Sequence, residues 1–458
     1  MTGPVRSLSS PEATGAVARR DQSAVAGVRF GVALAVIAAA GFAVRVVYAF
    51  VVDPALGFDA IWYVLQAGTI AEGVGYVDPA PFYEQGVETA TANFPPLWPG
   101  LLALVNVIGI ADTERAYQVV GAGLGAGTVV VTGLLGRRIA GEPVGLVAAL
   151  LVALSPSLVA ADGSLMAESL LVLLVGVALL LGDRILRGGG TGAWVALGLV
   201  LGLAVLSHSA ALVLAPVLVG VLVWRQPTAR PSRRVGYGTL ALAVAALIFL
   251  PWALRSGDAL GEPVALSSNS ASLLEGANCE SAYGGELIGS WDPACLRHTR
   301  APGLSESEWS ERARDAGVRY ARSHATRVPL VGGVRAFRAW GLYDPIDGAR
   351  AEAVETRNAD WQVGAWAVSL ALLAAAIVGA VALTRRGDVP VLLLAVIAAA
   401  TLLCVVSWGN SRFRLAADPA VAVLAAAGLV VAWERARRRG RPRGGAPSRR
   451  PGTEGPHR

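Results

Sequence analysis

The residues best suited to chemistry lie in the segment GFDAIWYVLQAG, residues 57–68, just after the first long apolar run. If this segment is helical, Asp59, Trp62, Tyr63 and Gln66 share one face, because they are three or four residues apart. A carboxylate beside aromatic rings suits a sugar site, since the acid can accept a hydroxyl proton while flat apolar faces cover the sugar ring or a lipid. The same residues also fit a short helix at the water interface, in which Asp59 caps the helix and the aromatic side chains are anchors.

The composition indicates that a membrane protein must position these residues. Of 458 residues, 54% are hydrophobic and 16% are charged, and the mean hydropathy is +0.54. These values are too apolar for a soluble domain. The net charge of +6 comes from arginines at the ends of apolar runs and in the C-terminal tail. This pattern is typical of membrane topology, so we expect no nucleic-acid partner.

Apolar runs and their flanking arginines predict an all-α polytopic fold with about ten transmembrane helices. The expected spans are 30–52, 115–136, 143–160, 165–183, 192–207, 209–224, 237–254, 361–384, 389–407 and 415–433. The arginine-rich loops then fall on one side together with both termini, and the positive-inside rule makes that side the cytoplasm. If the proline-rich run 95–110 crossed the membrane, the later arginine-rich loops would lie on the outer side, against the positive-inside rule. We therefore predict an outer interfacial helix there.

This topology divides the chain into five regions. They are a cytoplasmic N-terminal tail (1–29), a membrane domain (30–254) whose first outer loop is 53–114, a mixed extracytoplasmic insertion (255–360), C-terminal transmembrane helices (361–433) and a disordered basic cytoplasmic tail (434–458). In the insertion, apolar residues from Trp309 to Ala321 recur at helical spacing, which predicts an amphipathic helix. Cys279 and Cys295 also lie there, and an oxidising outer compartment favours a disulfide between them over two free thiols.

Several segments, in order along the chain, resemble the glycosyltransferase-C superfamily. These polytopic membrane glycosyltransferases include the protein O-mannosyltransferases and the bacterial aminoarabinose transferases, and the resemblance is to glycosyltransferase family 39. The resemblance begins with GFDAIWYVLQAGTIAEGVGY and NFPPLWPGLLAL. It continues through GLLGRRIAGEPVGLVAALLVALSPSLV, AADGSLMAESLLVLL and GLVLGLAVLSHSAALVLAPVL to SRFRLAADPAVAVLAAAGL. It implies an inverting transfer of a sugar from a polyprenyl-phosphate donor to a hydroxyl of a glycan, lipid or protein acceptor at the extracytoplasmic face of the cell membrane.

The resemblance assigns the role of general base to Asp59, which would deprotonate the acceptor hydroxyl as it attacks the anomeric carbon. Two positions depart from the family pattern. Ala60 stands where the family commonly has a glutamate, and His208 stands where it often has a lysine. No cofactor is certain from the sequence, and these departures leave the use of a divalent cation open.

Five further polar residues lie on the predicted outer face. Asp162 and Glu168 occupy a loop where the family often keeps acids that support the sugar site or a cation, although loop acids also cap helices. His208 fits a donor-phosphate contact or a solvated position at the interface. Arg412 and Arg414 face outward against the positive-inside trend, which favours binding of the donor phosphate or of a lipid headgroup.

Two other functions compete with sugar transfer. A transporter or a flippase for lipid-linked sugars would show internal repeats and charged residues at the membrane midplane. The sequence has no obvious repeat, and its polar residues gather on one face. Arg45 is the exception, and we expect it to reach either the interface or an internal acid. A noncatalytic scaffold would leave the outer acids and arginines unexplained.

Overall fold

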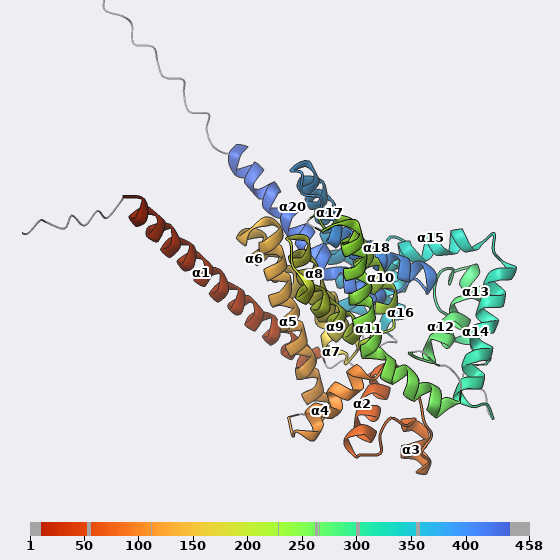
Figure 1. Ribbon diagram of the computed structural model, residues 1–458. Coiled ribbons are helices and arrows are strands. Elements are labelled where there is room, and N and C mark those ends of the chain that lie inside the picture. Colours follow the sequence, from red (N-terminus) through yellow and green to blue (C-terminus); the bar gives the residue numbers. More distant parts are fainter. Residues whose placement is uncertain are drawn as a thin grey trace, which may run out of the picture.

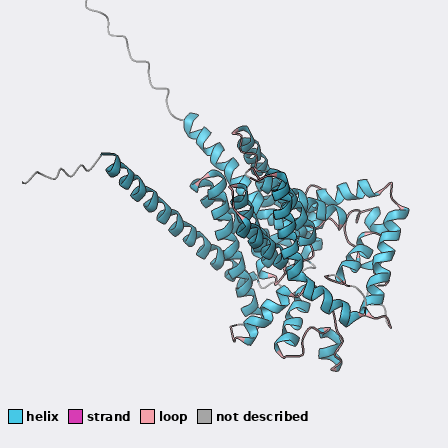
Figure 2. Ribbon diagram, in the orientation of Figure 1, coloured by secondary structure: helices cyan, strands magenta, loops and turns pink. Residues whose placement is uncertain are grey.

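Every regular element of the described chain is a helix (Figures 1 and 2). The computed structural model describes residues 11–52, 56–110, 112–227, 229–261, 264, 266–298, 303–353 and 358–439. Within them the predicted all-α class is confirmed. The mixed structure predicted for the insertion is wrong for its described residues, because its turns connect short helices and no strand forms there.

The long helices form a bundle. They are α1 (Pro11–Val47), extended by a π-helical turn (Tyr48–Val52), α5 (Glu114–Ala140), α6 (Glu142–Ala153), α7 (Pro156–Gly163), α8 (Glu168–Leu186), α9 (Thr191–Ser207), α10 (Ala211–Arg225), α11 (Pro231–Leu260), α17 (Ala359–Arg385), α18 (Val391–Val406) and α20 (Asp418–Arg439). Each of the ten predicted spans falls on one or two of these helices.

Short helices complete the fold at one end and one side of the bundle. The first outer loop forms α2 (Phe58–Ala71), α3 (Pro79–Gln85) and α4 (Leu97–Val107), and the insertion forms α12 (Asn269–Ala277), α13 (Glu280–Tyr283), α14 (Glu306–Ser323), α15 (Val328–Ala339) and α16 (Pro345–Ala353). A single turn, α19 (Ser411–Arg414), and a 3₁₀ turn (Leu415–Ala417) precede α20.

Six helical segments of the described chain are long and apolar enough to cross a membrane, and the pair α6 and α7, bent by 52°, adds a seventh if it counts as one span. Helices α9, α10 and α18 are apolar but have only 17, 15 and 16 residues. A multi-pass protein is therefore supported. The count of about ten crossings stays a prediction.

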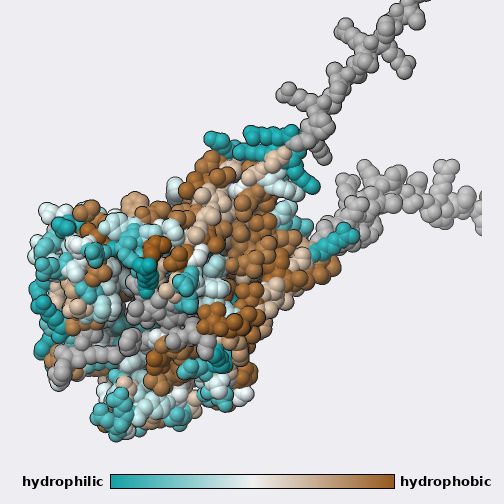
Figure 3. Space-filling model, turned by 180° about the vertical axis from the view of Figure 1, so that it is seen from behind, coloured by the Kyte–Doolittle hydropathy of each residue, from teal (hydrophilic) through white to brown (hydrophobic). Residues whose placement is uncertain are grey.

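The ends of the bundle differ in what they carry. The start of α1 and the end of α20 lie at one end, α2, α3 and α4 lie at the other, and α12 to α15 form a lobe beside the bundle (Figure 1). Apolar residues cover much of the visible bundle surface, whereas polar residues gather over the lobe (Figure 3). This distribution fits a bundle in lipid and a lobe in water.

The lobe confirms two predictions. Cys279 and Cys295 form a disulfide with an S–S distance of 2.06 Å. The predicted amphipathic helix is α14, which buries Trp309 and Ala313 and begins with a capping box between Ser305 and Glu308. Each partner of that box satisfies a backbone amide of the other, so the helix start is well defined.

The two tails differ from their predicted boundaries. Helix α1 begins at Pro11, inside the predicted N-terminal tail, and residues 1–10 lie outside the described residues. Helix α20 continues to Arg439, so the start of the predicted disordered tail is helical, while residues 440–458 lie outside the described residues. Helix-forming residues such as Glu434, Ala436 and Arg437 carry α20 past its apolar run.

Glycines allow α17 and α20 to pack at backbone contact. A Cβ atom on Gly379 would collide with the backbone carbonyl of Leu424, and one on Gly428 would collide with the carbonyl of Ala375. Small residues at such crossings let membrane helices approach closely.

We expect Gly379→Val to lower the free energy of unfolding by about 1–3 kcal/mol or more, because the carbonyl it meets is backbone and cannot rotate away. Thermal unfolding in detergent micelles measures the loss. Gly364→Val is the matched control, since Gly364 lies on the same helix and a Cβ atom added there would meet no atom within 4 Å. Equal stability of the two variants would contradict the close contact.

Candidate active site

Asp59 lies in the first turn of α2 and bonds to a residue far away in the chain. Arg412 Nη2 donates to Asp59 Oδ2 at 2.8 Å. The N-cap residue of α2 is Gly57, and no side chain caps this helix. The Asp59 side chain is 27% exposed, so the carboxylate is held by a cation and still reaches solvent.

Arg412 is shared between two carboxylates. Its Nε donates to Glu168 Oε1, where Glu168 is the buried first residue of α8. The arginine sits in α19, and the side chain of Asn410 caps this turn by accepting the Arg412 backbone amide at 2.9 Å. One planar guanidinium thus donates a charge-assisted hydrogen bond to each of two acids.

His208 completes the group at the end of α9. Its Nδ1 accepts a hydrogen bond from the Ala210 amide at 3.1 Å, so the neutral imidazole carries its proton on Nε2. That Nε2 lies 3.5 Å from Glu168 Oε1. We call Asp59, Glu168, His208 and Arg412 the Asp59 cluster. With two carboxylates against one guanidinium, its formal charge is −1 when His208 is neutral.

The aromatic neighbours of Asp59 are packed into the protein interior. Trp62 and Tyr63 are 8% and 2% exposed, and their ring centroids lie 6.1 Å and 4.8 Å from that of Phe94. Burial raises the pKa of Tyr63 well above its usual value, and the negative charge of nearby Asp59 is the second cause. These rings hold α2 against its surroundings, and their predicted contact with a sugar stays a prediction.

The structure corrects the predicted outer-loop position of Asp162. The residue lies in the buried helix α7, where its Oδ2 is 2.5 Å from Arg45 Nε. The other Arg45 nitrogens donate to the carbonyls of Gly41, Ala153 and Val152. Asp162 is therefore the internal acid expected for Arg45, and this pair lies outside the Asp59 cluster. The buried charge of Arg45 requires an anionic partner. This requirement explains why Asp162 is buried in α7 and not exposed in a loop.

The side chains of Arg412 and Arg414 point in different directions and have different partners. Arg414 Nη1 lies 3.2 Å from Asp418 Oδ1, Nη2 donates to Ser369 at 2.8 Å, and the guanidinium lies 5.4 Å from the centroid of Trp340. This side chain lines a cavity of about 510 Å³. Arg412 and Arg414 therefore have different neighbours, and their predicted binding of the donor phosphate stays a prediction.

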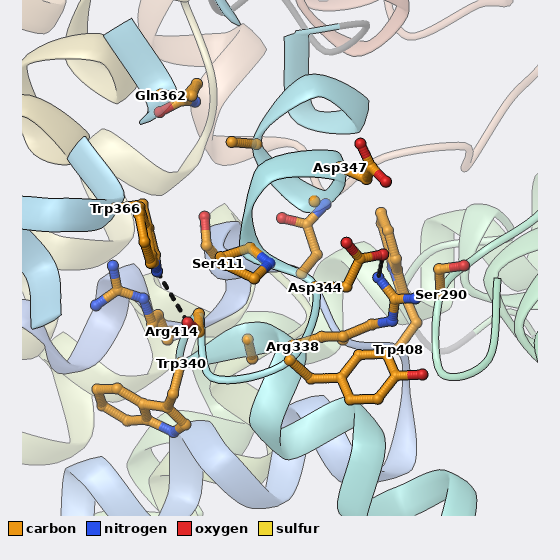
Figure 4. A pocket seen from close by; sticks show the side chains of 18 of the residues that line it. Ser290, Arg338, Trp340, Asp344, Asp347, Gln362, Trp366, Trp408, Ser411 and Arg414 are labelled. Carbon is orange, nitrogen blue, oxygen red and sulfur yellow. Dashed lines mark hydrogen bonds and ion pairs between the residues drawn. The ribbon is translucent and has the colours of Figure 1, made fainter. Parts of the chain in front are cut away.

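The cavity lies between the insertion, the first part of α17 and the chain before α19 (Figure 4). Trp340, Trp366 and Trp408 contribute to its walls. From Trp408, ring contacts continue to Phe413 at 5.9 Å and from Phe413 to His208 at 6.2 Å. The cavity and the Asp59 cluster are thus neighbours connected through α19.

Comparison with known proteins supports the sequence resemblance. The family model of dolichyl-phosphate-mannose-protein mannosyltransferase matches residues 93–254. The solved structure of the archaeal oligosaccharyltransferase AglB from Archaeoglobus fulgidus, in complex with an inhibitory peptide and a dolichol-phosphate, aligns with a TM-score of 0.54 at 18% identity. The alignment covers 90% of this chain and 51% of that chain. The chain has a glycosyltransferase-C fold.

Two more solved structures show similarity, at lower scores. The same A. fulgidus enzyme in complex with Zn and sulfate aligns at 19% identity with a TM-score of 0.51, covering 89% of this chain and 50% of that chain. ArnT from Cupriavidus metallidurans bound to undecaprenyl phosphate aligns at 14% identity with a TM-score of 0.43, covering 87% and 77%. The chain spans about half the length of the oligosaccharyltransferase. No curated protein matches it by sequence.

The Asp59 cluster does not fit a divalent cation. Among the described residues, the only three potential ligands within mutual reach are Cys279, Asp292 and Cys295, and these cysteines are joined in the disulfide. In the cluster, the Arg412 guanidinium lies between Asp59 and Glu168 and balances the charge that a metal ion would balance. We therefore derive no step through a metal.

Apart from Arg414, sequence reasoning missed the residues of the cavity and the Asp418 partner of Arg414. Asp418 follows Arg414 by four residues, a spacing that places the two on one helical face and could have revealed the pair. Gln362, Trp340 and Trp366 gave no such signal, because they come from segments whose meeting depends on tertiary packing.

Removing one partner of the buried pair should show whether Asp162 is structural. We expect Asp162→Ala to cost about 3–5 kcal/mol of unfolding free energy, because Arg45 would remain charged and unpaired in the interior. Thermal unfolding in micelles again measures this. Glu142→Ala, which breaks the partly exposed ion pair with Arg137, should cost no more than about 1 kcal/mol. A stable Asp162→Ala protein would argue against the structural role.

Proposed function

We propose that this protein is a membrane glycosyltransferase that moves a sugar from a polyprenyl-phosphate-linked donor to an acceptor hydroxyl, with Asp59 as the general base. The observation that carries the proposal is the position of Asp59. It is the more exposed carboxylate of a charged cluster, with a side chain 27% exposed against 2% for Glu168, in a chain with a glycosyltransferase-C fold.

The chemistry follows from the contacts of Asp59. An ionised Asp59 accepts the proton of the acceptor hydroxyl as the hydroxyl oxygen forms a bond to the anomeric carbon. The bond from that carbon to the phosphate oxygen breaks, and the phosphate leaves with the electron pair. Attack opposite the leaving group inverts the anomeric centre. The Arg412 guanidinium holds the orientation of the Asp59 carboxylate through its hydrogen bond.

Glu168 and His208 act by positioning Arg412. Glu168 accepts from Arg412 Nε and faces His208 Nε2, so the arginine is fixed from the side opposite Asp59. Arg412 Nη2 now bonds Asp59. Transfer of this hydrogen bond to the departing phosphate would stabilise the leaving group, so the predicted contact between Arg412 and the donor phosphate is retained here.

The partners follow from the fold and from the proteins that share it. The solved oligosaccharyltransferase binds a dolichol-phosphate and an inhibitory peptide, which supports a lipid-phosphate sugar carrier for this chain. The shared fold favours sugar transfer over the transporter and flippase alternatives. The sugar and the chemical type of the acceptor await assay.

Mutation of Asp59 tests the proposal directly. We expect Asp59→Asn to lower the turnover number about 10²- to 10⁴-fold, because the amide cannot accept the acceptor proton. Transfer of labelled pentose or hexose from polyprenyl-phosphate donors by purified protein measures it. Glu88→Gln changes an exposed acid of the same outer loop and should retain activity. Full activity of Asp59→Asn in a folded protein would remove Asp59 from the mechanism.

The proposed orientation places both termini in the cytoplasm and Asp59 outside, from the arginine distribution. We expect Glu88→Cys to react with a membrane-impermeant maleimide in intact cells, and Arg386→Cys to react only after the membrane is opened. Both positions are exposed in the protein. The wild type is the blank, because Cys279 and Cys295 are bonded and Cys404 is buried. The reverse labelling pattern would invert the proposed topology.

A further inference from the structure

Two residues of the cavity lining each have one buried donor with no hydrogen-bond partner in the described structure. The donors are Gln362 Nε2 and Arg414 Nε, on residues that are 4% and 6% exposed. Both residues line the cavity (Figure 4). An unpaired buried donor costs about 1–3 kcal/mol. Two of them at one cavity indicate a site for a molecule that supplies acceptor oxygens.

The walls of the cavity offer flat apolar surfaces whose polar ends are already bonded. Trp366 Nε1 donates to Gly341 O at 2.8 Å, and Trp340 Nε1 donates to Thr401 Oγ1 at 3.0 Å. The indole rings are therefore fixed, and a ligand would meet their faces rather than their N–H groups. Fixed aromatic faces suit the apolar face of a sugar ring.

The charges around the cavity argue against a phosphate ligand. The lining carries four acids and two arginines, namely Glu286, Asp292, Asp344 and Asp347 against Arg338 and Arg414. Arg414 is further neutralised by Asp418, and Arg338 lies 3.5 Å from Asp344. Four carboxylates against two guanidinium groups leave an excess of negative charge, which repels an anion.

We propose that this cavity binds a neutral saccharide. Sugar hydroxyls both accept and donate hydrogen bonds, so they can accept from Gln362 and Arg414 and donate to carboxylates of the lining, while the ring lies on the tryptophan faces. A volume of about 510 Å³ is within the usual range for small-molecule sites. This assignment replaces the phosphate role predicted for Arg414.

The cavity holds a non-reacting sugar unit of a glycan acceptor, a role that rests on the proposed function. Rings connect its Trp408 wall to His208 of the Asp59 cluster through Phe413. A glycan seated there would extend past α19 toward Asp59. The saccharide site itself does not depend on Asp59 being the base.

Binding of soluble sugars to the full chain in phosphatidylcholine nanodiscs tests the proposal. The probes are neutral manno-, gluco-, galacto- and arabino-oligosaccharides, measured by calorimetry, with inorganic phosphate and disc-embedded polyprenyl phosphate as anionic probes. We expect at least one oligosaccharide to bind, and Gln362→Leu and the near-isosteric Gln362→Glu to weaken it about tenfold through the lost donor. Gln226→Leu, which changes a buried glutamine outside the cavity lining, should leave binding unchanged.

The outcomes separate this site from the proposed reaction. Failure of every oligosaccharide to bind at millimolar concentration would overturn the saccharide site, as would oligosaccharide binding that both folded Gln362 variants retain. Loss of polyprenyl-phosphate or inorganic-phosphate binding in these variants, with oligosaccharide binding retained, would reassign the cavity to an anion. Saccharide binding that persists in Asp59→Asn supports the site, and a wild type that binds sugars without transferring any would reject only the proposed reaction.

Discussion

The bond network of Arg412 is the constraint on which the rest of the site depends. A guanidinium that is only 8% exposed cannot remain in the interior without anionic partners. Asp59 and Glu168 supply them from α2 and α8, which come from distant parts of the chain. The cluster can form only when α2, α8 and α19 meet, so the position of the Asp59 carboxylate depends on the packing of these helices.

The single turn α19 separates two different chemical environments. Arg412 leaves it toward two acids, and Arg414 leaves it toward Asp418, Ser369 and the tryptophan-lined cavity. Residues two positions apart in a helix face away from each other, because each residue advances the helix by about 100°. One short sequence, SRFR, thereby contributes to both the proposed proton-transfer site and the proposed saccharide site.

A second buried pair, Arg45 with Asp162, lies elsewhere in the bundle and shares no residue with the Asp59 cluster. It joins α1 to α7 inside the bundle, where its cost in lipid is offset by four hydrogen bonds from the guanidinium. Helices α17 and α20 also pack closely, because they cross at glycines. Charge pairing and close helix contact together hold the helices that carry the Asp59 cluster.

The sequence by itself determined the class of the protein, the helical positions, the disulfide and the polar residues worth testing. These properties depend on local hydropathy, helical spacing and flanking charge, which act over a few turns of chain. It also brought Asp59, Glu168, His208 and Arg412 to one predicted face, although not into one bonded group. Tertiary structure alone decided that Asp162 pairs with Arg45, that Arg412 and Arg414 diverge, and that Gln362 lines a cavity with four tryptophans. Such pairings between distant segments depend on which helices pack together. A local pattern reveals the partner of a buried charge only where both lie a few residues apart, as Arg414 and Asp418 do.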